Sequence, residues 1–282
     1  MTSTSELFSA SHSGAGLLIR DGLVVKTLQN NERSKLAIQS QSNFKEIKNR
    51  DFTLRSVPIY SMNESHDTLE ITMPYIHGLS GENIALSGDP DLALQIKEIL
   101  SMYIAINLSK CVREAISAEV FINKIKSLDF ASFGDIFSPY ASELVNIIES
   151  LPSLIYLPIG DCHGDLTFSN LIYNGVGVLY IYDFLPSFIN SPIIDYAKIR
   201  QEFYHGWTVR NLRGGALASG LQFIKSSIPV ELISMIETSY LTESKLLSIL
   251  NLLRIAPYVR NGQTADWVRA RLDLEFKISA LR

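Results

Sequence analysis

The sequence predicts an α+β protein of two lobes, a small β-rich N-terminal lobe (residues 1–76) and a larger helical C-terminal lobe (residues 77–282). Short apolar runs separated by turn signals occupy the N-terminal part, and long stretches with helical periodicity follow Gly88. A polar loop with flanking β-like segments interrupts the helical region between Ile155 and Phe188. A chain of 282 residues is long enough to bury the cores of two lobes.

Composition and charge exclude several classes of protein. With 46% hydrophobic and 19% charged residues, the chain is too apolar to be disordered, and its net charge of -4 is not that of a nucleic-acid binder. Two cysteines, Cys111 and Cys162, are too few for a disulfide scaffold or a cysteine-rich zinc site. The polar N-terminus does not resemble a signal peptide, and no apolar run of about 18 residues predicts a membrane span. We therefore expect a soluble, cytoplasmic protein.

The N-terminal lobe begins with a predicted hairpin, because Asp21-Gly22 separates the apolar runs Gly16–Arg20 and Leu23–Leu28. The stretch Glu32–Asn49 follows. It contains no Gly or Pro and has widely spaced apolar residues, which predicts one amphipathic helix that is mostly exposed. Two further strands are predicted, at 56–60 and 68–73.

The C-terminal lobe begins with a clear helix start at Asp89-Pro90. The run from there to Lys110 places its large apolar residues on one face, which predicts a single long helix. Further helices are predicted at 114–127, 139–150, 192–204, 229–239, 243–256 and 263–279.

Three polar residues in the central loop have a spacing that suggests chemistry. Asn170 follows Asp165 by five residues, and Asp183 follows it by eighteen. The apolar segments 171–173 and 178–182 flank Asn174-Gly175, and a hairpin there would bring Asp183 back beside Asn170. A carboxylate beside a carboxamide oxygen suits Mg²⁺, and a second carboxylate can orient a hydroxyl and accept its proton.

The pattern His163-Gly164-Asp165-x-x-x-x-Asn170, followed by Asp183-Phe184, resembles the catalytic loop and metal aspartate of the protein-kinase-like phosphotransferases. Gly164 after the histidine makes it similar to the aminoglycoside phosphotransferase and choline kinase branch. With Leu253–Tyr258, the chain looks most like the phosphotransferases found with bacterial capsule and surface-polysaccharide genes.

The resemblance implies a two-lobed kinase-like fold and transfer of a phosphoryl group from ATP to a hydroxyl of a small molecule. Asp165 would position and deprotonate that hydroxyl, and Asn170 and Asp183 would hold Mg²⁺. Asp195 would open a helix and brace the catalytic loop. His163 would orient this loop, and Cys162 beside it would be a buried small residue.

The resemblance also assigns roles in the N-terminal lobe. Ser13, Gly14 and Gly16 precede or begin the first strand and would let backbone amides approach the phosphates. Lys26 would be the strand lysine that neutralises the phosphates. Glu46, inside the predicted helix, is the best candidate for its partner, and Glu32 is the alternative.

The connector between the lobes would hold the nucleotide base. Pro74 lacks an N–H but keeps a carbonyl that can accept a hydrogen bond from an amino group. Ile76 offers both backbone groups.

The charge of the C-terminal part of the chain predicts the class of molecule that accepts the phosphoryl group. From Gln201 to Arg282, ten Arg and Lys stand against seven Asp and Glu, and Lys198 and Arg200 face either an acceptor phosphate or solvent. This excess favours a neutral or anionic acceptor, such as a sugar, a sugar phosphate or an alditol, over a polycationic aminoglycoside.

Two alternatives to a small-molecule kinase remain, a Ser/Thr protein kinase and a nucleotide-binding module without turnover. Gly164 argues against the first, and the intact Asp165, Asn170 and Asp183 argue against the second.

Overall fold

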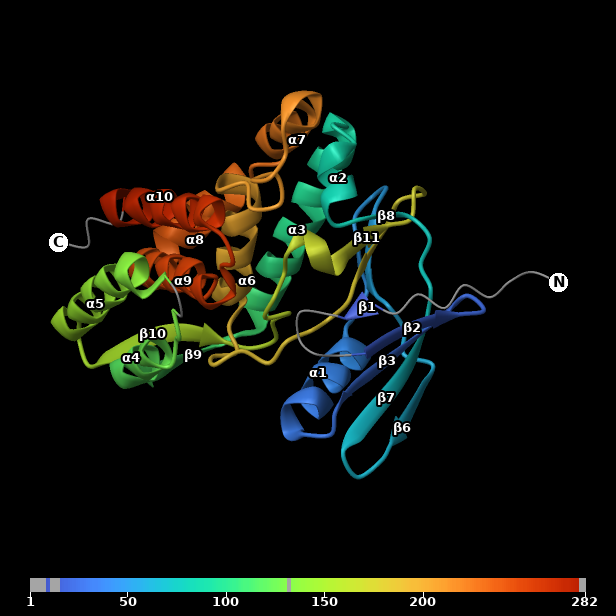
Figure 1. Ribbon diagram of the computed structural model, residues 1–282, viewed down its shortest axis with the longest axis horizontal. Helices are drawn as coiled ribbons and strands as arrows, with labels where there is room; N and C mark the ends of the chain where they lie inside the picture. The colour runs from blue at the N-terminus through green and yellow to red at the C-terminus, as the bar shows by residue number, and fades with distance from the viewer. Residues whose placement is uncertain (1–8, 11–15, 131–132, 279–282) are drawn as a thin grey trace. The chain divides into compact units, whose positions relative to one another are not determined.

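The computed structural model describes residues 9–10, 16–130 and 133–278 (Figure 1). The chain forms two compact units. Unit 1 comprises Met1–Ile84 and Phe168–Pro186, and unit 2 comprises Ala85–Thr167 and Ser187–Arg282. Unit 1 thus extends eight residues beyond the expected lobe boundary at residue 76, and it also contains the central hairpin.

The first sheet of unit 1 is five-stranded and antiparallel, in the order β1-β2-β3-β7-β6. Asp21 and Gly22 form the predicted tight turn between β2 and β3, and both have positive φ (51° and 74°), as a turn of this kind requires. The strands are β1 (Ser9–Ala10), β2 (Gly16–Arg20), β3 (Leu23–Gln29), β6 (Ser61–Glu64) and β7 (Thr68–Pro74).

The second sheet of unit 1 joins two distant parts of the chain, in the order β4-β5-β12-β11-β8. The predicted hairpin forms, with Leu171 opposite Ile181, and its second strand pairs in parallel with β5. Through this parallel pairing, the hairpin belongs to a sheet of unit 1, although the chain on both sides of it belongs to the helical unit 2. The strands are β4 (Ile47–Lys48), β5 (Thr53–Ser56), β8 (Leu79–Ser80), β11 (Leu171–Tyr173) and β12 (Val178–Ile181).

Helix α1 (Glu32–Asn43) is shorter than predicted. The chain turns to extended backbone at Phe44, and Ile47–Lys48 pairs with β5 instead of continuing the helix. The strand predicted at 56–60 is also wrong, since β5 ends at its start and β6 begins just after it. Pro58 cannot donate to a ladder, which explains the break.

The core of unit 1 lies between α1 and the sheets. Gln41 on α1 is buried, and its Nε2 donates to the carbonyl of Val57 at 2.8 Å. The apolar cluster that surrounds it is built from Ile38, Val57, Leu69, Ile71 and Met73. This amide-to-backbone bond fixes α1 against the segment between β5 and β6.

Unit 2 is mostly helical, as predicted. Asp89 caps the first long helix through hydrogen bonds from the Asp91 and Leu92 amides. Residues 112–117 form a strand rather than the start of the predicted helix, and the helix over 214–226 was not predicted. The elements are α2 (Glu82–Leu86, across the boundary of the units), α3 (Pro90–Lys110), β9 (Val112–Ser117), α4 (Ala118–Lys126), α5 (Gly134–Ser150), β10 (Leu154–Ile159), α6 (Pro192–Ile199), α7 (Gly214–Ser226), α8 (Val230–Ser239), α9 (Leu241–Leu253) and α10 (Gly262–Ile278).

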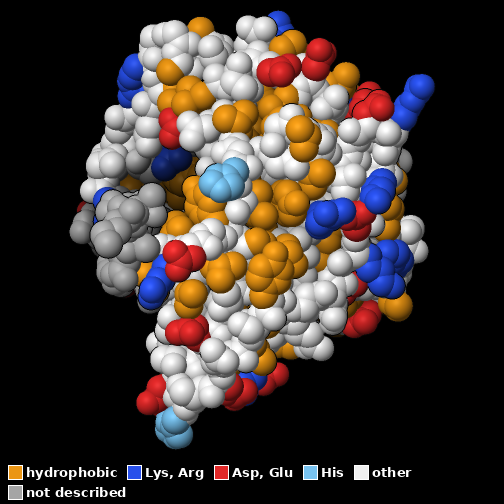
Figure 2. Space-filling model, turned by 90° about the vertical axis from the view of Figure 1, so that its right-hand side faces the viewer, with side chains coloured by type: hydrophobic (Ala, Val, Ile, Leu, Met, Phe, Trp, Pro, Cys, Tyr) orange, Lys and Arg blue, Asp and Glu red, His pale blue; other side chains and the backbone are white. Residues whose placement is uncertain are grey.

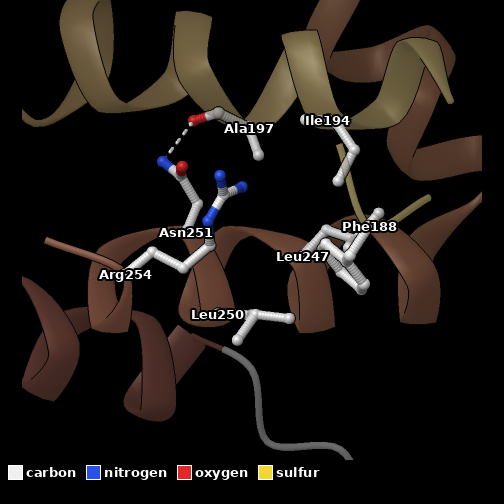
Figure 3. Close-up of a pocket in the computed structure, with 7 residues that line it drawn as sticks. All are labelled: Phe188, Ile194, Ala197, Leu247, Leu250, Asn251 and Arg254. Carbon is white, nitrogen blue, oxygen red and sulfur yellow. Dashed lines mark hydrogen bonds between the residues drawn. The ribbon is translucent and has the colours of Figure 1, made fainter. Parts of the chain in front are cut away.

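Helix α6 lies in the core of unit 2, and every one of its residues is buried. Figure 3 shows Ile194 and Ala197 of this helix facing Leu247 and Asn251 of α9, where the Asn251 Nδ2 donates to the Ala197 carbonyl at 3.4 Å. A π-helical turn over Arg200–Tyr204 continues α6. Among the described residues, no helix combines the length and the apolar character needed to cross a membrane.

Candidate active site

In unit 2, the loop that carries Asp165 is held by a buried carboxylate. Asp195, in the first turn of α6, is fully buried. Its Oδ2 accepts from the His163 amide at 2.6 Å and from the Tyr103 hydroxyl at 3.0 Å, and its Oδ1 accepts from the Gly164 amide at 2.8 Å. The predicted brace of the loop is therefore confirmed. The sequence placed Tyr103 on the apolar face of its helix and contained no signal for its hydroxyl contact.

Burial dominates the electrostatics around this brace. It raises the pKa of Asp195, while His163 and the donated hydrogen bonds oppose that effect. Burial also raises the pKa of the Tyr103 hydroxyl and of the Cys162 thiol well above their ordinary values. Cys162 is therefore a protonated thiol at neutral pH. It is half-buried, whereas the sequence predicted a buried residue.

The Asp165 side chain lies next to a lysine from α6. The Lys198 Nζ is 3.0 Å from the Asp165 Oδ1, and the two side chains are 10% and 33% exposed. His163 is fully buried, and its Nδ1 accepts from the Asp165 amide at 3.2 Å, as expected of a residue that orients the loop. Lys198 is therefore largely buried and paired with Asp165 rather than facing solvent. The sequence contains one indication of this contact. Lys198 follows Asp195 by three residues, and residues three apart lie on the same face of a helix.

In unit 1, Lys26 and Asp183 form an ion pair. Lys26 lies on the central strand β3 and its side chain is 10% exposed, while that of Asp183 is 38% exposed. The Lys26 Nζ is 2.6 Å from the Asp183 Oδ1. Asp183 has a φ of 61°, in the left-handed region that Asp adopts more readily than most residues, where the chain leaves β12.

Asn170 lies at the same end of the hairpin as Asp183. It precedes β11 in a short 3₁₀ turn, and its carbonyl accepts from the Tyr182 amide at 3.2 Å across the hairpin. The Asn170 side chain is buried. Carboxylate and carboxamide oxygens are the hard donors that Mg²⁺ prefers, so Asn170 and Asp183 fit this ion. Among the described residues, no group of three or more His, Cys, Asp or Glu suggests another metal site.

Glu46 is not the partner of Lys26. It follows the end of α1 and forms ion pairs with Arg55 and Lys48 on the surface, which lower the pKa of its carboxyl. The expectation that it holds Lys26 is wrong, because the helix ends at Asn43 and the ion pair of Lys26 is with Asp183. The alternative, Glu32, is an exposed residue in the first turn of α1.

Of the remaining residues predicted to bind nucleotide, the structure describes Gly16, Pro74 and Ile76. Ser13 and Gly14 are outside the described residues, while Gly16 begins β2 opposite Thr27. Pro74 ends β7, and Ile76 packs against the apolar core of unit 1. Their contacts with a nucleotide remain predictions.

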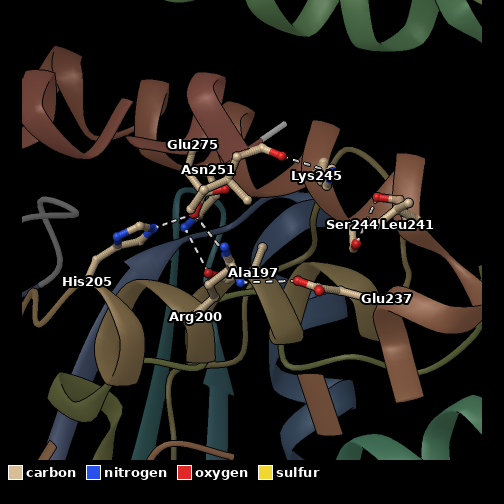
Figure 4. Close-up of polar contacts among 10 residues, drawn as sticks. Ala197, Arg200, His205, Glu237, Leu241, Ser244, Lys245, Asn251 and Glu275 are labelled. Carbon is tan, nitrogen blue, oxygen red and sulfur yellow. Dashed lines mark hydrogen bonds and ion pairs between the residues drawn. The ribbon is translucent and has the colours of Figure 1, made fainter. Parts of the chain in front are cut away.

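Arg200 belongs to a buried polar cluster rather than to an acceptor pocket (Figure 4). Its Nε donates to the Glu275 Oε1 at 2.8 Å, and the same oxygen lies 2.8 Å from the His205 Nε2. Arg200 also lies 3.4 Å from the Glu237 carboxylate. Burial lowers the pKa of His205, and contacts with His205 and Arg200 lower the pKa of Glu275 against the effect of its own burial.

Charges on the surface are mixed. Figure 2 shows Lys and Arg side chains interspersed with Asp and Glu on the face that it presents, rather than one patch of a single sign. This distribution agrees with the small net charge of the chain.

Comparison with known proteins identifies the fold. No protein-family profile matches the sequence. No curated protein matches it either. A thermostable mutant of an aminoglycoside phosphotransferase, solved as a ternary complex with ADP and hygromycin B, is similar with a TM-score of 0.59 and 14% identity, over 99% of this chain and 95% of that chain. A glucosamine kinase is similar with a TM-score of 0.54 and 14% identity, over 95% of this chain and 79% of that chain. The chain therefore has the α+β, protein-kinase-like fold of the aminoglycoside phosphotransferases.

Proposed function

We propose that this protein is an ATP-dependent kinase of a small molecule, which transfers the terminal phosphoryl group of ATP to a hydroxyl. The observation that carries the proposal is Asp165, a partly exposed carboxylate on a loop whose backbone is held by the buried Asp195. Phosphoryl transfer depends on positioning and charge neutralisation more than on covalent chemistry, and a fixed carboxylate supplies the first of these.

In the proposed reaction, Asp165 accepts the proton of the acceptor hydroxyl while the acceptor oxygen forms its bond to the γ-phosphorus. The bond between that phosphorus and the β,γ-bridging oxygen breaks, and ADP leaves with the electron pair. Asn170 follows Asp165 by only five residues, so the covalent chain keeps the metal ligand within about 18 Å of the base.

We assign binding of the ATP phosphates to unit 1. Lys26 donates to phosphate oxygens from its largely buried position on a central strand. Asn170 and Asp183 would hold Mg²⁺, which neutralises phosphate charge when bound. Backbone groups of Ser13, Gly14 and Gly16 contact the phosphates, and those of Pro74 and Ile76 contact the base.

We propose that the acceptor is neutral or anionic, for example a sugar, a sugar phosphate or an alditol of surface-polysaccharide metabolism. The ammonium of Lys198, 3.0 Å from the Asp165 carboxylate, disfavours an acceptor with a cation beside its reacting hydroxyl. The net positive charge of residues 201–282 supports the same preference. Arg200, which precedes this stretch, takes no part because it is paired inside unit 2.

A transfer assay with γ-³²P-labelled ATP and Mg²⁺ tests the proposal. The panel contains neutral sugars, alditols, sugar phosphates, amino sugars, aminoglycosides and a mixed protein substrate. We expect label on a neutral or anionic small molecule. Label on protein alone would indicate a protein kinase, and label on aminoglycosides alone would contradict the acceptor class. Failure to transfer label to any acceptor, with ATP still bound, would favour a binding module.

A further inference from the structure

Lys198 is a lysine whose charge is buried. Its residue is 8% exposed, and its Nζ lies 3.0 Å from the Asp165 Oδ1. An ammonium removed from water is costly unless an opposite charge compensates it. The Asp165 carboxylate supplies that charge, so the burial of Lys198 and the ionised state of Asp165 depend on each other.

Helix α6 holds the loop in two ways. Asp195 accepts hydrogen bonds from the backbone amides of His163 and Gly164. Lys198 comes three residues later, on the same face of the helix, and contacts the side chain of Asp165. One helix therefore fixes the backbone with an anion and the reacting side chain with a cation.

We propose that Lys198 is a positioning residue that sets the orientation and the charge state of Asp165; this inference rests on the function proposed above. A carboxylate offers about four lone-pair sites on its two oxygens, and the ammonium occupies one of them on Oδ1. The contact restricts rotation of the carboxylate, so its two oxygens keep one orientation. It also keeps Asp165 ionised at lower pH than an unpaired carboxylate.

Several other titratable groups surround this pair in unit 2. Asp195 is engaged by three donors, and His163 accepts the Asp165 amide at Nδ1. Cys162 and Tyr103 stay neutral at pH 7, because burial raises the pKa of each well above its ordinary value. Lys198 contacts the Asp165 carboxylate directly, so its replacement tests the effect of this contact on Asp165.

The experiment compares Lys198→Met, Lys198→Gln and Lys198→Arg with the wild type. Lys35→Met is the matched control, since Lys35 forms a 2.7 Å pair with Glu64 in which both side chains are nearly half exposed. Each protein carries ¹³C-labelled aspartate carboxyl groups. The titration midpoint of Asp165 is followed by NMR and assigned by the signal that disappears in Asp165→Asn. Far-UV circular dichroism checks that each variant is folded.

We expect the midpoint of Asp165 to rise by about 1 pH unit or more in the two uncharged variants, as loss of an opposite charge at this distance predicts. Lys198→Arg keeps the wild-type midpoint, and so does Lys35→Met. In the enzyme assay, kcat falls about 10-fold or more in Lys198→Met, the acid limb of its pH profile moves to higher pH, and the KM for ATP stays within about two-fold.

A midpoint in Lys198→Met or Lys198→Gln that stays within about 0.3 pH unit of the wild type would overturn the role of Lys198. If the uncharged variants fail to fold, Lys198→Arg becomes the deciding variant. A raised midpoint of Asp165 in Lys198→Arg, which keeps the positive charge, would mean that this charge does not control the ionisation of Asp165. The titration needs no substrate. Absence of transfer by the wild type would contradict the proposed function, whereas an unmoved midpoint contradicts only this inference.

Discussion

Each compact unit contains a buried lysine paired with a more exposed carboxylate, and the two pairs differ in what holds them. In unit 1, Lys26 lies on a central strand, and Asp183 extends from left-handed backbone after β12. In unit 2, Lys198 lies on a fully buried helix that also holds the backbone beside Asp165. The second carboxylate is thus fixed through its backbone and its side chain.

This difference indicates different roles for the two pairs. In the proposed function, Asp183 holds a metal ion, so its pair with Lys26 must open when Lys26 donates to phosphate oxygens. Asp165 orients a hydroxyl in that proposal, and Lys198 stays paired with it. Changes at the two carboxylates should therefore separate turnover from nucleotide binding.

Asp165→Asn should have the largest effect. The substitution keeps the shape of the side chain and removes the base, so turnover on the true acceptor should fall about 10²-fold or more. Calorimetry should show ATP affinity within about two-fold of the wild type, because unit 1 is unchanged. Turnover near the wild-type level would mean that Asp165 is not the base.

Asp183→Ala should show the opposite pattern. Wild-type protein should bind ATP more tightly with Mg²⁺ than without it, since Asn170 and Asp183 are suited to hold the ion. The variant should lose that difference and bind ATP in Mg²⁺ at least about 10-fold more weakly, or about 1.4 kcal/mol. Asp67→Ala is the control, because the Asp67 side chain is 87% exposed. Equal ATP affinity with and without Mg²⁺ in the wild type would contradict the assignment of the metal ligands.

The site was predictable from sequence where local spacing alone determines it. The turn at Asn174-Gly175 brings Asp183 beside Asn170, and these two residues were predicted together. Lys198 was not assigned to Asp165, because the contact depends on the packing of α6 against the loop. Glu46 was assigned to the wrong partner, because the polar pattern of residues 32–49 contains no helix stop. The helix ends where Ile47 gains a strand partner in β5.

In the fold, too, only features set by local interactions could be predicted from the sequence. Asp89 predicted the start of α3 correctly, since its cap is a local interaction. The parallel pairing of β12 with β5 joins segments more than a hundred residues apart, and no periodicity within either segment indicates its partner. The membership of the hairpin in unit 1 was therefore not predictable from its own sequence.

The cluster of Arg200, His205 and Glu275 is a third ionic group, and it is buried more deeply than either lysine pair. Its contribution to stability should depend on pH. Burial lowers the pKa of His205, so between about pH 7 and pH 5 the unfolded chain takes up a proton that the folded protein resists. Stability should fall as pH falls through this window, by at most about 1.4 kcal/mol per pH unit from this group. Denaturant unfolding of His205→Gln should show a smaller loss between pH 7 and pH 5.

Glu275 does not obscure that measurement. Its pKa is lowered, so its contribution to stability is present above its unfolded value of about 4.5 and is lost below it. The difference between the wild type and His205→Gln from pH 7 to pH 5 therefore reports on His205 and not on Glu275. An equal slope in the wild type and His205→Gln would indicate that the imidazole accepts its proton as readily in the folded protein as in the unfolded chain.

The smallest effect is expected at Glu46, and it separates the pairing seen in the structure from the pairing that the sequence suggested. Glu46 forms surface ion pairs with Arg55 and Lys48, and exposed pairs of this kind contribute little to stability. Glu46→Gln should leave kcat and the KM for ATP within about two-fold of the wild type. Lys26→Met, measured in parallel, should raise the KM for ATP at least about 10-fold, because the buried ammonium is lost. If Glu46→Gln weakens ATP binding as much as Lys26→Met does, then Glu46 reaches Lys26 when nucleotide is bound, and the Lys26–Asp183 pair belongs to the nucleotide-free protein alone.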